Sequence, residues 1–177
     1  MEKTIWFDMD GTIADLYGVN NWLEMLINKD ARPYKVAKPL LNMQQLAKEL
    51  NRLIKKGYKI GIISWLAKNS NSDYDKKVAE VKRNWLKKHL KSVKFENIDI
   101  VAYGTPKQIN RKGILFDDEK QNRENWLGIT YDVKNILQIL RELWKITLFW
   151  CGEPADRACA CARYTGDCCH EKIFYFF

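Results

Sequence analysis

Short apolar segments alternate along this chain with segments of helical periodicity, and this alternation constrains the fold more than any other feature. Four segments have the length and hydrophobicity of buried strands, and they lie at residues 4–7, 58–64, 98–102 and 113–116. Three segments repeat apolar residues on one helical face, and they lie at residues 42–56, 73–88 and 133–145. Strands that alternate with helices usually form a parallel sheet with crossover connections. We therefore predict an α/β fold.

Polar side chains stand where three of the predicted strands end. The first strand runs into Asp8-Met9-Asp10-Gly11-Thr12, the second ends at Ser64, and the fourth runs into Asp117-Asp118-Glu119. The carboxyl ends of parallel strands share one edge of a sheet, so we expect these side chains to lie close together. Clustered carboxylates are costly unless a cation is bound, and Mg²⁺ suits oxygen ligands while keeping positions for water and phosphate. The predicted ligands are Asp8, Asp10, Asp117 and Asp118.

The motifs resemble those of the haloacid dehalogenase-like hydrolases. Asp-x-Asp-Gly-Thr after an apolar strand is the signature of that family, and it stands here at residues 8–12. Three further family motifs follow in order: Ser64 at a strand end, a lysine at 107 or 112, and the pair Asp117-Asp118. The resemblance covers about residues 3–145. It implies a Rossmann-like three-layer α/β/α domain over residues 1–146, with a small helical cap inserted at about residues 14–42.

The resemblance also implies a magnesium-dependent phosphatase that works through an aspartyl-phosphate. Asp8 would be the nucleophile, and Asp10 would act as general acid and then general base. Gly11 and Thr12 would form the loop beside the phosphate, and the Ser64 hydroxyl would hold a phosphate oxygen. Asp8, the backbone carbonyl of Asp10, and either Asp117 or Asp118 would bind Mg²⁺. The alternative for the first motif is a simple turn with Asx hydrogen bonds.

Two lysines compete for the role of binding the phosphate. Lys107 follows Gly104-Thr105-Pro106 in the loop after the third predicted strand, where a site lysine should lie. Lys112 stands just before the fourth strand, at the opposite end from the site. We therefore favour Lys107, although either could be an ordinary surface lysine.

The stretch between Asp10 and Asn42 is the place for the cap. A short helix is predicted after Asn20 or Asn21, followed by a loop over residues 30–39. Its candidate substrate-binding side chains are aromatic or cationic, namely Tyr17, Trp22, Arg32 and Tyr34. Such side chains suit a nucleobase and its phosphate, and ordinary packing would explain them equally well. A looser resemblance to the 5'(3')-deoxyribonucleotidases makes a nucleoside monophosphate the predicted substrate.

The charge leaves a second interpretation open. The net charge is +8, from 30 Lys and Arg against 22 Asp and Glu, and it could mark a phosphatase that acts on nucleic-acid ends. Because the lysines are scattered through the chain, solvated helix faces explain the charge better. A binding protein that kept the fold and lost catalysis is a third interpretation.

We find neither a signal peptide nor an apolar run that could span a bilayer, so we expect a cytoplasmic protein without a membrane partner and leave its oligomeric state open.

Residues 147–177 differ in composition from the rest and are predicted to be an extension of unknown role. All five cysteines lie there, in a segment that ends with Ile173-Phe174-Tyr175-Phe176-Phe177. A body without cysteine suits a reducing compartment. Thiolate and imidazole ligands for zinc could come from Cys159, Cys161, Cys168, Cys169 and His170. Their spacing differs from the usual Cys-x2-Cys pairs, so a zinc site is the less favoured interpretation.

Overall fold

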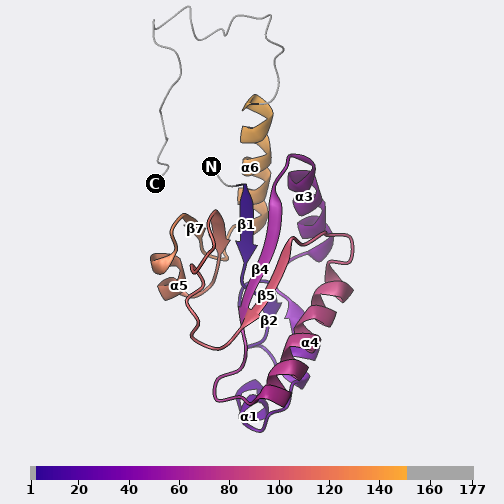
Figure 1. The fold of residues 1–177 in the computed structure, drawn as a ribbon. Helices are drawn as coiled ribbons and strands as arrows, with labels where there is room; N and C mark the ends of the chain where they lie inside the picture. Colours follow the sequence, from indigo (N-terminus) through magenta and orange to yellow (C-terminus); the bar gives the residue numbers. More distant parts are fainter. Residues whose placement is uncertain (1–2, 151–177) are drawn as a thin grey trace, which may run out of the picture.

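A five-stranded sheet forms the centre of the computed structural model, which describes residues 3–150 (Figure 1). Its strand order is β5-β4-β1-β6-β7, and every neighbouring pair is parallel. The strands are β1 (Thr4–Phe7), β4 (Lys59–Trp65), β5 (Asn97–Val101), β6 (Ile114–Phe116) and β7 (Ile129–Tyr131). The chain adds β4 and β5 on one side of β1 and then β6 and β7 on the other. The carboxyl end of β1 is therefore the topological switch point of the sheet.

Three long helices cover one face of this sheet. They are α3 (Met43–Lys55), α4 (Ser72–His89) and α6 (Ile136–Trp150). Their apolar stripes pack against alternate residues of β1, β4 and β6 in one continuous core. Phe7 and Phe116 stack at its centre, with 4.9 Å between ring centroids. Burial of these side chains is the main stabilising contribution to the fold.

The opposite face carries a thinner cover. Trp126 follows the short helix α5 (Lys120–Asn125) and packs on Trp6, Ile63 and Leu115. The two covered faces give a three-layer α/β arrangement, so the predicted α/β class and parallel sheet are confirmed. No helix within residues 3–150 is long and apolar enough to cross a bilayer. The predicted cysteine-rich extension and its possible zinc ligands lie outside the described residues, apart from the last turn of α6.

Most predicted elements are present with shifts of a few residues at their ends. The side chain of Asn42 caps α3 by accepting a hydrogen bond from Gln45 N, and Asn71 caps α4 in the same way. The sequence did not indicate α5 and β7, because α5 contains no apolar residue and β7 has only two, neither of them fully buried. The predicted loop over residues 30–39 is wrong in part, since α2 (Arg32–Val36) forms there with Pro33 in its first turn.

The segment between β1 and α3 lies over the carboxyl ends of the strands. It contains β2 (Ala14–Asp15), α1 (Trp22–Ile27), α2, and β3 (Lys38–Pro39), and β2 pairs antiparallel with β3. Figure 1 shows α1 at the end of the molecule toward which the β1 arrow points. Two hydrogen bonds tie this segment to α4: Tyr74 Oη donates to the carbonyl of Asp30 at 3.0 Å, and Trp85 Nε1 donates to that of Ala37 at 2.8 Å. The segment is therefore held over the strand ends from one side.

Candidate active site

The predicted site residues meet at the carboxyl edge of the sheet. Asp8 follows β1 directly, Ser64 is the penultimate residue of β4, and Asp117 follows β6. All three are at most 5% exposed, as is Lys107 from the loop after β5. The backbone N–H of Asp8 donates to the carbonyl of Phe116 at 2.9 Å, which extends the pairing of β1 with β6 as far as the acidic residues. Sheet register thus fixes the relative positions of the two acidic motifs.

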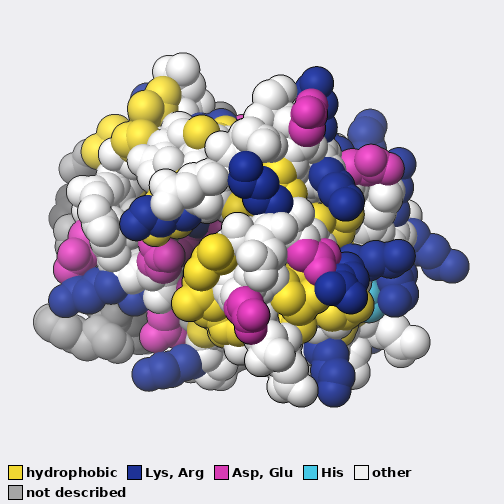
Figure 2. Space-filling view, turned by 90° about the horizontal axis from the view of Figure 1, so that it is seen from below, with side chains coloured by type: hydrophobic (Ala, Val, Ile, Leu, Met, Phe, Trp, Pro, Cys, Tyr) yellow, Lys and Arg dark blue, Asp and Glu magenta, His cyan; other side chains and the backbone are white. Residues whose placement is uncertain are grey.

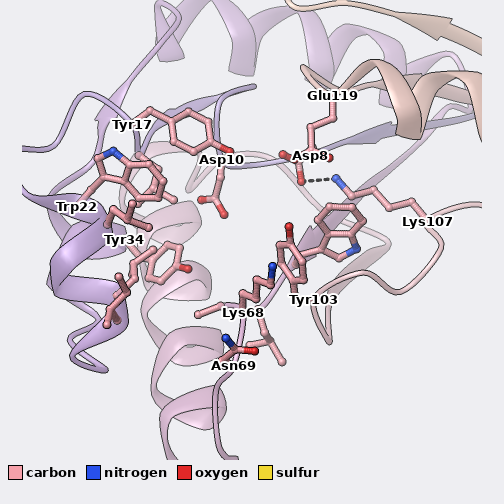
Figure 3. Close-up of a pocket in the computed structure, with 17 residues that line it drawn as sticks. Asp8, Asp10, Tyr17, Trp22, Tyr34, Lys68, Asn69, Tyr103, Lys107 and Glu119 are labelled. Atoms are coloured by element: carbon pink, nitrogen blue, oxygen red, sulfur yellow. Dashed lines mark hydrogen bonds and ion pairs between the residues drawn. The ribbon is translucent and has the colours of Figure 1, made fainter.

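Lys107 lies between two of the buried carboxylates. Its Nζ donates to Asp8 Oδ1 at 2.8 Å and to Asp117 Oδ2 at 2.7 Å, and Figure 3 shows the first of these contacts. Burial favours the neutral form of Asp8 and raises its pKa to about 7, against the opposing effect of Lys107. Burial alone would lower the pKa of Lys107, but the Asp8 and Asp117 carboxylates raise it to about 12. The lysine is therefore a fixed positive charge beside Asp8.

The other candidate lysine takes no part in this cluster. The side chain of Lys112 is exposed, and its backbone carbonyl accepts a hydrogen bond from Trp6 Nε1 at 3.1 Å.

The loop that carries Lys107 is held in place by two contacts. Trp65 Nε1 donates to the carbonyl of Thr105 at 2.8 Å, and Arg111 forms an ion pair with Asp99 at 2.6 Å.

The acidic pair after β6 divides into two environments. Asp117 accepts hydrogen bonds from Lys107, from Asn122 Nδ2 at 3.1 Å and from the backbone N–H of Glu119 at 2.9 Å. Asp118 accepts from Thr12 Oγ1 at 3.2 Å, and burial, with the nearby Asp117 charge, raises its pKa to about 6. Both carboxylate oxygens of Asp117 therefore accept hydrogen bonds from neighbouring groups, whereas Oδ2 of Asp118 can still bind a cation.

Gly11 makes room for the second oxygen of Asp118. The residue has φ 79°, and a Cβ built on it would overlap Asp118 Oδ2 and lie 2.7 Å from a ring carbon of Tyr17. Both the left-handed backbone and the lack of space require glycine at this position. The loop after β1 can therefore approach the acidic pair after β6 closely.

Lys82 of α4 joins the site and was not predicted. It is fully buried, and its Nζ donates to Asp10 Oδ2 at 2.5 Å, to Ser64 Oγ at 2.8 Å and to the carbonyl of Trp65 at 2.6 Å. Lysines on an amphipathic helix usually point to solvent, so the sequence pattern alone did not single it out. The available signal was its spacing, because Lys82 lies four residues after Val78 and three before Trp85, two of the apolar residues that define the inward face of the predicted helix at 73–88.

A cavity of about 490 Å³ opens beside these groups. Asp8, Asp10, Lys107 and Glu119 line its polar end. Figure 3 shows three of the predicted substrate-binding side chains, Tyr17, Trp22 and Tyr34, on one side of the space. Tyr103 and Lys68 stand across from them, and Trp65 packs on Tyr103 with 5.2 Å between ring centroids. The cavity is thus acidic and cationic at its base and aromatic along its walls.

Arg32, the fourth predicted substrate-binding residue, is not brought to this cavity. Its guanidinium forms an ion pair with Asp30, and its side chain is 72% exposed. It lines a separate surface depression together with residues of α1. The turn into α2 orients the side chain away from the strand ends, a geometry that the sequence did not reveal.

The oxygen groups at this edge suit a cation that needs few protein ligands. Across residues 3–150, no group of three or more His, Cys, Asp or Glu side chains is placed to hold a metal ion. Mg²⁺ is usually bound through one or two carboxylates, with water and substrate phosphate in its other positions. The residues fit such an ion, because the two buried cations among the described residues, Lys82 and Lys107, stand against four carboxylates, those of Asp8, Asp10, Asp117 and Asp118. A cage built entirely of protein ligands does not fit them.

Figure 2 shows the end of the molecule that carries the strand ends, with apolar side chains exposed among charged ones and many Lys and Arg side chains along one side.

No model of a known protein family matches the chain, and no curated protein matches its sequence. The chemistry of the site is therefore the basis for any functional conclusion.

Proposed function

We propose that this protein is a magnesium-dependent phosphohydrolase of the haloacid dehalogenase-like kind, with Asp8 as its nucleophile. One observation carries the proposal: the Lys107 ammonium lies 2.8 Å from the Asp8 carboxylate, at a buried strand end that borders a cavity. A carboxylate that attacks a phosphate must overcome repulsion between two anions, and a fixed cation beside it lowers that barrier.

The remaining groups have matching roles in phosphoryl transfer. Asp8 attacks phosphorus while the bond to the leaving oxygen breaks, and Asp10 gives that oxygen a proton. Water then attacks the aspartyl-phosphate, Asp10 accepts a proton from the water, and inorganic phosphate leaves while the Asp8 carboxylate is restored. Lys107 and the Ser64 hydroxyl stabilise the negative charge on the phosphate oxygens through both steps.

Mg²⁺ would be held by Asp8, the backbone carbonyl of Asp10, and Asp118. Asp118 is the better ligand of the pair because the oxygens of Asp117 already accept hydrogen bonds from Lys107, Asn122 and Glu119 N. When bound, the ion offsets the charge of the phosphate and favours the ionised form of Asp8, whose pKa burial raises to about 7.

The cavity supports a phosphate monoester whose leaving group carries a flat aromatic ring. Its volume of about 490 Å³ lies in the range of small-molecule sites, and its walls are aromatic. Tyr17, Trp22, Trp65 and Tyr103 offer rings on which a nucleobase can stack, with its phosphate toward Asp8. A nucleoside monophosphate, with deoxynucleotides included, is therefore the proposed substrate.

A panel of phosphate monoesters tests this function. Purified protein is mixed with ribo- and deoxyribonucleoside 5'- and 3'-monophosphates, sugar phosphates and 4-nitrophenyl phosphate, each with Mg²⁺ or with a chelator, and released phosphate is measured. We expect Mg²⁺-dependent release that is fastest with nucleotides. Asp8→Asn is the matched control, with turnover lower by about 10³-fold or more and an unchanged circular dichroism spectrum. Equal rates for nucleotides and sugar phosphates would argue against a nucleotide as the substrate. Wild-type activity in Asp8→Asn would show that Asp8 is not the nucleophile.

A phosphatase for nucleic-acid ends is the second candidate. It is favoured by the exposed basic side chains of α4, which are Lys76, Lys77, Arg83, Lys87 and Lys88. Such a protein would release phosphate from the end of an oligonucleotide faster than from a mononucleotide, and its rate would fall steeply with salt. A rate on oligonucleotide ends that does not change with salt would exclude this candidate.

A further inference from the structure

Lys82 is a buried ammonium whose contacts are all on the site side of α4. Its side chain is completely buried, although the helix around it presents most of its charged residues to solvent. Removing an ammonium from water is costly, and buried lysines are rare unless they are paired. A lysine at this position therefore needs strong compensation from its surroundings.

That compensation is complete. An ammonium has three N–H donors, and Lys82 Nζ has three acceptors: Asp10 Oδ2 at 2.5 Å, Ser64 Oγ at 2.8 Å and the carbonyl of Trp65 at 2.6 Å. The ring of Tyr34 covers the same nitrogen, with its centroid 4.7 Å away. The acceptors come from the loop after β1 and from the end of β4, so one nitrogen joins three parts of the fold.

These bonds determine how two site residues present themselves to a substrate. Because Ser64 Oγ accepts from Lys82, its hydroxyl hydrogen is left to donate to another acceptor, and in the proposed function that acceptor is a phosphate oxygen of the substrate. Asp10 is held through Oδ2, so Oδ1 is left to exchange a proton with the leaving group. Figure 3 shows the Asp10 carboxylate directed into the cavity.

We infer that Lys82 is a positioning residue for Asp10 and Ser64. It determines which oxygen of Asp10 exchanges a proton with the substrate, and it determines the direction in which the Ser64 hydroxyl donates. The inference rests on the proposed phosphohydrolase function, and it adds to that function a residue that acts through others. A purely structural role would link α4 to the sheet and would affect every substrate alike. A positioning role affects most the substrates whose leaving group needs a proton.

Leaving-group dependence separates the two roles. An alkyl phosphate such as a nucleoside monophosphate needs Asp10 to protonate its leaving oxygen, whereas 4-nitrophenolate leaves without a proton. We measure kcat/KM for both esters. This ratio depends only on the steps up to the first irreversible one, so the later hydrolysis of the aspartyl-phosphate does not affect it. General acid catalysis contributes about 10²-fold or more, so Lys82→Met should lose about 10²-fold on the nucleotide and less than about tenfold on 4-nitrophenyl phosphate. Lys48→Met, at an exposed position of α3, is the control and should match the wild type.

A double variant supplies a second, independent readout. In an Asp10→Asn background the part of the effect that runs through Asp10 is already lost, so Lys82→Met should cost less than about tenfold on the nucleotide, the part that runs through Ser64. Equal losses on both esters, or full additivity with Asp10→Asn, in an active wild type would overturn the inference alone. A wild type that releases phosphate from neither ester would remove the proposed function and the inference with it.

Because Lys82 is buried, its replacement can impair folding, which unfolding by heat will reveal. In that case a crystal structure of the unsubstituted protein decides. Lys82 Nζ within about 3.2 Å of Asp10 and Ser64 supports the inference, and Nζ more than about 4 Å from the Asp10 carboxylate overturns it.

Discussion

Thr12 and Asp118 hydrogen-bond each other in both directions although 106 residues separate them: Thr12 Oγ1 donates to Asp118 Oδ1 and accepts from the backbone N–H of Asp118, each at 3.2 Å. Thr12 is completely buried, so water cannot replace either bond. The pair fastens the loop after β1 to the loop after β6, and it holds the free oxygen of Asp118 against Gly11.

Thr12→Val keeps the shape of this contact and removes its hydroxyl. We expect a loss of about 1–3 kcal/mol in the free energy of unfolding, because the Asp118 N–H is left unpaired. The concentration of Mg²⁺ needed for half-maximal activity should rise as Asp118 becomes less well fixed. Denaturant unfolding and a Mg²⁺ titration measure the two effects. Thr12→Ser retains the hydroxyl and should stay close to the wild type in both.

Replacement of Lys107 distinguishes it from Lys112. Lys107→Met leaves the buried carboxylates of Asp8 and Asp117 without their shared cation, so we expect a loss of about 3 kcal/mol or more in unfolding free energy near pH 8. Phosphate release should fall by about 10²-fold or more. The exposed Lys112→Met should change stability by less than about 0.5 kcal/mol. A larger effect at Lys112 than at Lys107 would contradict the assignment.

The raised pKa of Asp8 gives a pH dependence of stability with a definite sign. Its pKa is about 7 in the folded protein, against an ordinary value of 3.8 for an aspartate in water, so the folded state binds more protons between these values. This carboxyl stabilises the fold below about pH 4 relative to higher pH, and that contribution is lost as the pH rises through about 7. Asp118, with a pKa of about 6, contributes in the same direction.

Thermal unfolding in chelator tests this at several pH values. Relative to the wild type, Asp8→Asn should gain stability as the pH is raised from about 5 to 8, since only the wild type acquires the buried charge. Addition of Mg²⁺ should stabilise the wild type at the higher pH and leave Asp8→Asn nearly unchanged. The opposite result would be a wild type that becomes more stable than Asp8→Asn in chelator as the pH rises. It would show that the protein stabilises the ionised Asp8 carboxylate without a metal ion.

The aromatic wall predicts a change in KM that depends on the substrate. Tyr103 is 52% exposed at the cavity and packs on Trp65. Stacking on a base contributes about 1–3 kcal/mol, so Tyr103→Ala should raise KM by about tenfold for nucleoside monophosphates and little for glycerol phosphate. Arg32→Ala should have no effect on either substrate, because its side chain lies at a separate depression. Steady-state kinetics of both variants check the two expectations.

Much of the fold follows from local patterns. Apolar residues repeat with the period of a strand or a helix wherever one side of an element is buried, and such repeats located β1, β4, β5 and β6 as well as α3, α4 and α6. Elements with few or no apolar residues leave no such repeat, and for this reason α5, β7 and α2 were missed. The choice of Lys107 over Lys112 also came from local order, since a lysine after a parallel strand and one before it lie at opposite edges of the sheet.

The sequence by itself determined which groups stand at the strand ends: Asp8, Asp10, Ser64 and Asp117 follow from where buried runs stop. The tertiary structure decided which of their neighbours reach them. The contact of Lys82 with Asp10 spans 72 residues, and it depends on how α4 is rotated over the sheet. The division of roles between Asp117 and Asp118, and the placement of Arg32 away from the cavity, likewise depend on loops that pack across the sheet. Periodicity along a chain records burial, whereas contacts between distant segments depend on strand order and helix rotation, which no local pattern encodes.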